Sequence, residues 1–166
     1  MPSPKNATGS QDEKHHEEKD MRRAYEHLGR VEILQQFLQP ASAHEVGVLV
    51  ALAQQEIQNG HKRQASELLR ASEHLSFAAL GIEETKKAPP AKDLERAISE
   101  EFEHLTHKAE ERWEHGDRHE GLAAIYKFSL QTAKTALKHG EYHPALELAR
   151  AADALAGVKQ HEVPQP

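Results

Sequence analysis

The sequence predicts an all-α protein of about six helices, and three observations support this fold class. Residues that lose little side-chain freedom in a helix, namely Ala, Leu, Glu, Lys, Gln and Arg, are abundant. Apolar side chains recur at three- and four-residue spacing along most of the chain. The alternation of β-branched and polar residues that marks strands is missing, so we expect no sheet.

The first predicted helix runs from about residue 14 to Gln39, after a segment at 1–13 that is rich in Pro, Ser and charge. We expect this opening segment to be disordered. Pro40 should end the helix because proline cannot continue it. Ser42 to Glu45 then have the form of a capping box, which should start the second helix.

The second and third predicted helices form a hairpin. Asn59 and Gly60 are a helix-ending pair because glycine enters the left-handed conformation freely. The second helix should therefore end at Gln58. The third should run on to Leu80, where Gly81 stops it.

The interior linker is predicted at residues 82 to 92, because its consecutive prolines forbid helix. Asp93 should cap the fourth helix, and Gly116 should end it. Asp117 to Glu120 look like a second capping sequence, from which the fifth helix should start.

The last two predicted helices repeat the hairpin pattern of the second and third. Gly140 should end the fifth helix, and Pro144 fits the first turn of the sixth, where its missing amide hydrogen costs nothing. We expect the sixth helix to reach Gly157 and the chain to fray after it.

The chain divides into two similar three-helix units. A shift of 80 residues aligns identical residues at the two hairpins. These are Ala53, Gly60, Ala65, Glu67, Leu68, Arg70, Ala71 and Leu75 with Ala133, Gly140, Ala145, Glu147, Leu148, Arg150, Ala151 and Leu155. The first helices are also alike, since Tyr25 to Leu28 resemble Phe102 to Leu105 at a shift of 77. The prediction is an internal duplication, packed about a pseudo-twofold axis or paired between chains.

The predicted organisation follows from these boundaries. It consists of a disordered tail at 1–13, a first unit at 14–81, a linker at 82–92, a second unit at 93–157 and a C-terminal tail at 158–166.

Composition and charge exclude several function classes. The formal net charge of −6 argues against a binder of the nucleic-acid backbone, which carries a basic face. Without cysteine there is no thiol nucleophile or thiolate metal site. No apolar run suits a signal peptide or a membrane span, so we expect a cytoplasmic chain with no membrane partner. No Ser/His/Asp set or glycine-rich phosphate loop is present, so the sequence predicts no catalytic and no cofactor-binding residues.

The thirteen histidines raise a divalent-metal alternative, because neutral imidazole is the commonest protein ligand for such ions. The best candidates combine carboxylates and imidazoles on the predicted fourth helix with one histidine of the first. They are Glu103, His104, His107, Glu111 and His27.

The competing interpretation of the fourth helix is a solvated acidic face. A four-helix carboxylate site requires a Glu-x-x-His element on two helices, and the first helix has Ala24 where the glutamate is needed. Folding back at the corner should instead place Glu100 near Lys134 and Glu95 near Lys138 on the fifth helix.

A third alternative is RNA cleavage. The spacing of Arg22 and His27 resembles the Arg-x4-6-His motif of HEPN-type ribonucleases, which are helical proteins that cut RNA from a dimer interface. Beside His104 in the second unit, Ser99 stands where the arginine would be, and the net charge is negative.

The hairpins carry a further pattern: a small residue, Gly seven positions later, an aromatic two beyond it, and Ala at five and twelve after the Gly. The second hairpin has it at Ala133, Gly140, Tyr142, Ala145 and Ala152, and the first follows it in part at Ala53, Gly60 and Ala65. Over residues 53–75 and 133–155 this resembles tetratricopeptide repeats. The resemblance implies a scaffold that binds partner proteins and has no catalytic residues. Our leading prediction is therefore a non-catalytic helical interaction or adaptor module, with a protein partner or a second copy of itself.

Overall fold

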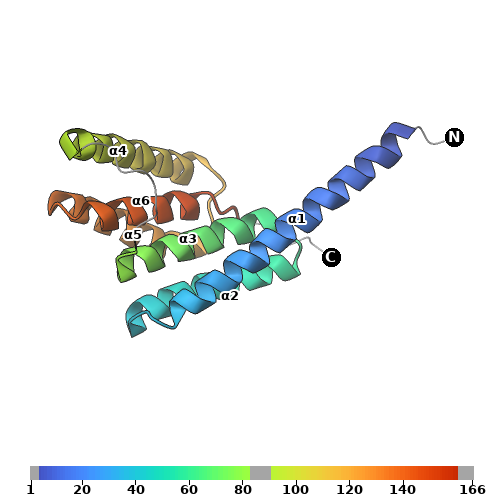
Figure 1. Ribbon diagram of the computed structural model, residues 1–166, viewed down its shortest axis with the longest axis horizontal. Helices are drawn as coiled ribbons and strands as arrows, with labels where there is room; N and C mark the ends of the chain where they lie inside the picture. Colours follow the sequence, from blue (N-terminus) through green and yellow to red (C-terminus); the bar gives the residue numbers. More distant parts are fainter. Residues whose placement is uncertain (1–3, 83–90, 161–166) are drawn as a thin grey trace.

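The computed structural model describes residues 4–82 and 91–160 (Figure 1). Within these ranges it contains α-helices and one short 3-10 helix, and no strand, so the predicted all-α class is confirmed. The elements are α1 (Pro4–Gln35), α2 (Pro40–Gln58), α3 (Lys62–Leu80), α4 (Ala91–His115), the 3-10 helix η1 (Glu120–Leu122), α5 (Ala123–Lys138) and α6 (Tyr142–Ala156). Most of the predicted linker, residues 83–90, lies outside the described part of the chain.

The bundle is centred on α3 and α6, which lie side by side (Figure 1). Helices α1 and α2 pack against α3, whereas α4 and α5 pack against α6. Each group of three thus hides its apolar faces inside itself and against the other group. This arrangement suits the predicted pseudo-twofold axis, while the duplication of the two units stays a prediction.

The two hairpin corners have the same local geometry. Gly60 and Gly140 both adopt positive φ, at 79° and 74°. In each case the amide after the glycine donates a hydrogen bond to the carbonyl five residues earlier, at 2.8 Å and 2.9 Å respectively. This is the six-to-one bond of a Schellman motif, which satisfies carbonyls left free at a helix end. Both predicted glycine stops are confirmed.

The predicted start of α2 is wrong. Helix α1 already ends at Gln35, and Pro40 occupies the first turn of α2. Its N-cap residue is Gln39, which makes no side-chain cap hydrogen bond. Proline begins a helix well because its fixed φ suits the first turn and its missing N–H is not needed there. Ser42 and Glu45 therefore lie inside the helix and do not form a capping box.

The predicted starts of α4 and α5 also need correction. Asp93 lies in the first turn of α4, which begins at Ala91. The segment from Asp117 is not a cap of α5: His119 precedes the 3-10 helix and makes no side-chain cap hydrogen bond. The corner is fixed instead by the end of the chain, since the His119 amide donates to the Val158 carbonyl at 3.2 Å.

The chain does not fray directly after α6. Val158 is only 2% exposed, and the Lys159 amide donates a hydrogen bond of 2.8 Å to the side chain of Gln64 on α3. Gly157 has φ of −84°, so a left-handed turn does not explain it. A Cβ there would lie 2.5 Å from Nη2 of Arg112, so the glycine makes room for that guanidinium. The rest of the predicted tail, 161–166, lies outside the described residues.

Helix α1 begins at Pro4, before the expected start near residue 14. Proline fits the first turn of a helix because its missing N–H is not needed there. The first half of α1 projects away from the bundle in Figure 1. The second half of α1 packs against the bundle, and there Ala24 and Val31 are fully buried.

Helix α6 is the most enclosed element, and small side chains allow its neighbours to approach closely. Its alanines at 145, 149, 151, 152 and 154 have no exposed surface. No helix in the described part of the chain has both the length and the apolarity that crossing a membrane requires.

Candidate functional site

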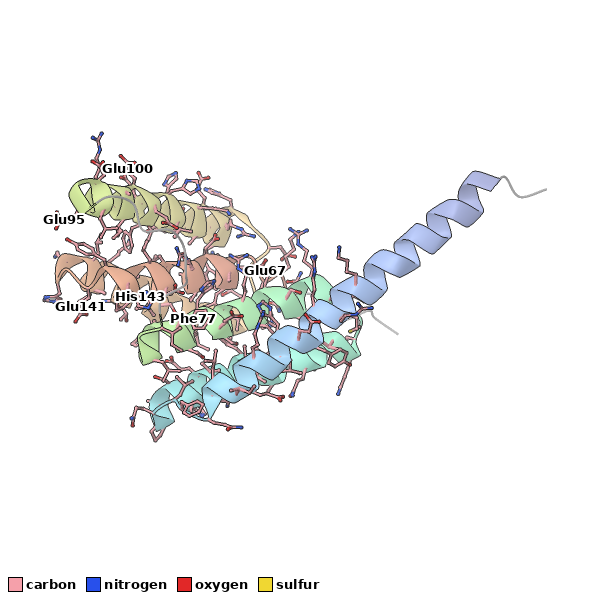
Figure 2. The ribbon with its side chains drawn as sticks, viewed as in Figure 1. Glu67, Phe77, Glu95, Glu100, Glu141 and His143 are labelled. Carbon is pink, nitrogen blue, oxygen red and sulfur yellow. The ribbon has the colours of Figure 1, made fainter. Side chains whose placement is uncertain are left out.

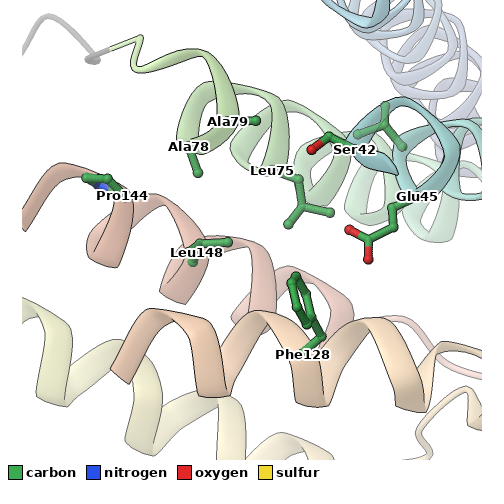
Figure 3. A pocket seen from close by; sticks show the side chains of 9 residues that line it. Ser42, Glu45, Leu75, Ala78, Ala79, Phe128, Pro144 and Leu148 are labelled. Atoms are coloured by element: carbon green, nitrogen blue, oxygen red, sulfur yellow. The ribbon is translucent and has the colours of Figure 1, made fainter. Parts of the chain in front are cut away.

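A pocket of about 150 Å³ opens where the first turns of α2 and α6 meet the end of α3 and the middle of α5 (Figure 3). Most of the residues that line the pocket are apolar. The side chains that define it are Val46, Leu75, Phe128, Pro144 and Leu148, with Glu45 as its one carboxylate.

Small residues create the space. Ala78 and Ala79 end α3, and Ser42 lies in the first turn of α2, so three of the lining positions carry little bulk. Phe128 from α5 lies across from them, and its ring is 53% exposed. The pocket therefore exists before any ligand arrives, because four packed helices hold its walls.

Glu45 brings charge to an otherwise apolar lining. Its partial burial raises the pKa of the carboxyl above the ordinary value, and neighbouring His44 only partly opposes this. No side chain in the described residues forms a hydrogen bond or ion pair with Glu45. The carboxylate thus loses part of its hydration and gains only the weaker charge interaction with His44 in return.

The opposite end of the α3–α6 pair is packed. The ring of Trp113 stacks on Tyr126 with centroids 4.2 Å apart, and the guanidinium of Arg118 lies 5.5 Å from the Trp113 ring centre. Burial, followed by the charges of Glu110 and Glu114, raises the pKa of Tyr126 to about 12. Leu122 and Val158 fill the remaining space.

A buried ionic cluster joins the two halves of the bundle. Glu147 of α6 has no exposed surface. It accepts hydrogen bonds from Nδ1 of His74 at 2.6 Å and from Nη1 of Arg150 at 2.7 Å. Arg150 extends the chain of contacts to Glu101 of α4, at 2.9 Å. Removing one member would leave the others buried and underpaired, so this cluster fixes how α3, α4 and α6 fit together.

A second acid of α6, Asp153, is surrounded by cations. Arg112 donates to its carboxylate at 3.1 Å, and Lys108 and Arg70 lie 3.7 Å and 3.8 Å away. Figure 2 shows Glu67 between α3 and α6, and its Oε1 lies 3.5 Å from Nη1 of Arg70. Oε2 of Glu67 is buried and makes no hydrogen bond among the described residues. The positive charges around it offset the cost of that burial.

A third pair involves one of the predicted metal ligands. Nε2 of His27 lies 2.6 Å from Oε2 of Glu73, and Arg30 is 3.8 Å from the same oxygen. Burial alone would raise the pKa of Glu73, but His27 and Arg30 outweigh it, so the pKa is lowered. His27 therefore joins α1 to α3 through its hydrogen bond with Glu73.

The remaining predicted metal ligands all lie on α4 with exposed side chains, and among the described residues none of them contacts His27 or Glu73. They are Glu103, His104, His107 and Glu111. Across the described part of the chain, no three His, Asp or Glu side chains are grouped so that they could hold a metal ion. The structure does not bring the five candidates together.

The acidic face of α4 forms other pairs than those expected. Lys134 of α5 pairs with Glu110 at 2.8 Å, and Glu100 pairs with Arg96 on its own helix. Figure 2 shows Glu100 pointing away from the bundle, and Glu95 bonds to the hydroxyl of Tyr142 at 3.0 Å. The predicted pairs are wrong because the corner after α4 is longer than a single glycine turn, which shifts the register of α5.

Arg22 of the proposed ribonuclease motif is exposed, and His27 is engaged by Glu73. The His27 imidazole is therefore already used in a contact between α1 and α3.

The sequence analysis missed both the pocket and the buried cluster. Phe128 lies off the apolar stripe of its helix, and an aromatic residue on a polar face is a detectable signal. Glu147 falls among alanines and leucines in the apolar stripe of α6, which marks a buried charge. Neither signal identifies the residue across the interface, which lies more than seventy positions away.

Comparison with protein-family models, with curated proteins and with solved structures finds no match to this chain. Its function is therefore inferred from the geometry of its own residues.

Proposed function

We propose that this chain is a non-catalytic helical interaction module that binds a partner protein at the pocket between α2, α3, α5 and α6. The observation that carries the proposal is the ring of Phe128, more than half exposed while lining an apolar pocket. Large aromatic side chains beside apolar pockets are typical anchors of protein interfaces.

The rigidity of the walls supports the same function. Leu75 and Leu148 at the pocket belong to α3 and α6, and the residues directly before them, His74 and Glu147, join the two helices. A preformed site loses little conformational entropy when a partner binds. The resemblance of the hairpins to tetratricopeptide repeats adds support, since that spacing is typical of scaffolds that bind proteins.

The proposal is tested by selecting binders from a displayed library of random peptides on the immobilised protein. We expect enriched peptides whose affinity falls about thirtyfold on Phe128→Ala, the loss typical of an interface hot spot. The matched control is Tyr25→Ala, because Tyr25 is similarly exposed at 56% but lies on α1 and does not line the pocket.

Both variants should unfold like the parent, because each removed ring is largely exposed. If no peptide is enriched, or if the enriched peptides bind both variants as well as the parent, the pocket is not a protein-binding site.

A further inference from the structure

Resting on the interaction function proposed above, we infer that the partner segment presents an apolar side chain next to a lysine or arginine. The apolar side chain fills the pocket, and the cation pairs with Glu45 at its rim. The partner is thus a basic, apolar peptide segment and not an acidic one.

The volume of the pocket determines the size of the apolar side chain that the partner inserts. An engineered protein cavity of about 150 Å³ lined by apolar side chains binds benzene. The pocket here has about that volume. It therefore holds one side chain of the size of leucine or phenylalanine, and a longer apolar run would extend past its edge.

The Glu45 carboxylate determines the charge expected on the peptide residue next to the apolar anchor. Among the described residues no cation forms a hydrogen bond or ion pair with Glu45, and only the weaker charge interaction with His44 acts on it. Glu45 lines the same pocket as Leu75 and Phe128. A partner's cation would compensate for the hydration that the Glu45 carboxylate loses on burial. The hydrogen bond between them would be charge-assisted, and such bonds are stronger than neutral ones. An acidic partner would bring two like charges together at the rim, which is costly.

Phe128 and the charge of the whole chain favour the same partner. The face of an aromatic ring attracts a lysine or arginine that lies against it. The net charge of −6 also speeds the approach of a basic segment.

The experiment measures the affinity of synthetic peptides taken from the selection. We expect a lysine or arginine beside the apolar anchor in the enriched sequences. Replacing that cation with glutamine should weaken binding to the parent roughly tenfold, as for a hydrogen bond to a charged group. When the protein carries Glu45→Gln, replacing the peptide's cation with glutamine should have little effect on affinity. The Glu45→Lys variant should prefer a peptide with glutamate in place of the cation.

Glu26→Gln is the matched control, because Glu26 is an exposed carboxylate on α1, far from the pocket lining. It should behave like the parent toward every peptide. Affinity for the basic peptide should also fall as salt is added, because the pair at the rim is partly exposed.

The outcomes separate this inference from the proposed function. Peptides that depend on Phe128 but show no charge preference, or prefer acid, overturn the inference and leave the interaction module standing. Failure to select any Phe128-dependent peptide overturns both. If the chain forms a dimer that Phe128→Ala dissociates in sedimentation experiments, a second copy occupies the pocket and the inferred partner is wrong.

Discussion

The two ends of the α3–α6 pair each have a glycine corner of the same local geometry, but the side chains around them differ. At four pairs of positions 80 residues apart, the side chain at one end is smaller or more polar than its counterpart at the other. The pairs are Ser42 with Leu122, Glu45 with Ile125, Val46 with Tyr126, and Ala78 with Val158. The first member of each pair lines the pocket, whereas Leu122, Tyr126 and Val158 are buried at the packed end.

The two ends show that the features that build the helical bundle differ from the features that leave an open pocket in it. The glycine corners and apolar stripes are common to both ends, so they build the scaffold. A few changes of side-chain volume decide whether an end is filled or open, because protein interiors are close-packed and a missing group leaves a void that neighbours do not fill completely.

The largest effect is expected from opening the packed end. Trp113→Ala removes a ring that is 7% exposed and stacked on Tyr126, which should lower the free energy of unfolding by about 3 to 5 kcal/mol. Chemical denaturation measures the loss. Phe128→Ala at the open end is the control and should cost less than about 1 kcal/mol, because exposed substitutions seldom exceed that. Equal losses in the two variants would show that the ends do not differ in packing.

The next largest effect is expected at the packed end, where the Arg112 guanidinium lies close to the backbone of Gly157. Gly157→Ala places a Cβ 2.5 Å from Nη2 of Arg112 and should displace the guanidinium from Asp153, at a cost of about 2 kcal/mol. Gly29→Ala in α1 is the control, since nothing lies within 4 Å of the added Cβ. It should stabilise the protein by about 0.5 to 1 kcal/mol, because alanine favours helix over glycine. Thermal unfolding of both variants would expose the difference in sign.

A smaller effect is expected from making the open end resemble the packed one. Glu45→Ile introduces the residue found at position 125 and removes a partly buried carboxylate that forms no hydrogen bond or ion pair with a cation among the described residues. The free energy of unfolding should rise by up to about 1 kcal/mol from added apolar burial. Peptide binding should be lost at the same time. A less stable variant would indicate that Glu45 has a structural partner.

The pH dependence of the α1–α3 contact is a further test. The folded pKa of Glu73 lies below its unfolded value, so the stabilisation is present above the unfolded pKa and is lost as pH falls through the folded one. Stability measured from pH 6 to pH 3 should therefore fall less steeply in Glu73→Gln than in the parent. Parallel curves would mean that His27 and Glu73 are not paired in solution.

The smallest effect is spectroscopic and leaves neutral stability unchanged. The pKa of Tyr126 is raised to about 12, so its ring should ionise after that of an ordinary tyrosine in an ultraviolet titration. Because the unfolded side chain ionises near pH 10, stability is lost as pH rises above that value. Tyr126→Phe should remove the late step, and an unchanged titration would contradict the burial of this ring.

Several features of the fold could be predicted from local sequence. Gly60 and Gly140 set the corners because a positive φ favours glycine wherever the chain folds. The helix starts were less accurate: Pro40 begins α2 although a capping sequence follows it, since a cap motif and a first-turn proline compete for the same boundary. Ion-pair partners on α4 were wrong because the length of one corner shifts every pair after it.

The sequence by itself determined that this chain is helical, where its hairpins turn, and which face of each helix is apolar. These properties depend on backbone preference and on periodicity within one helix. Only the tertiary structure decided that Glu45 lies beside Phe128 and that His74 meets Glu147. Such contacts join residues from separate helices, and their partners follow from how the helices cross and which side chains fill the space between them.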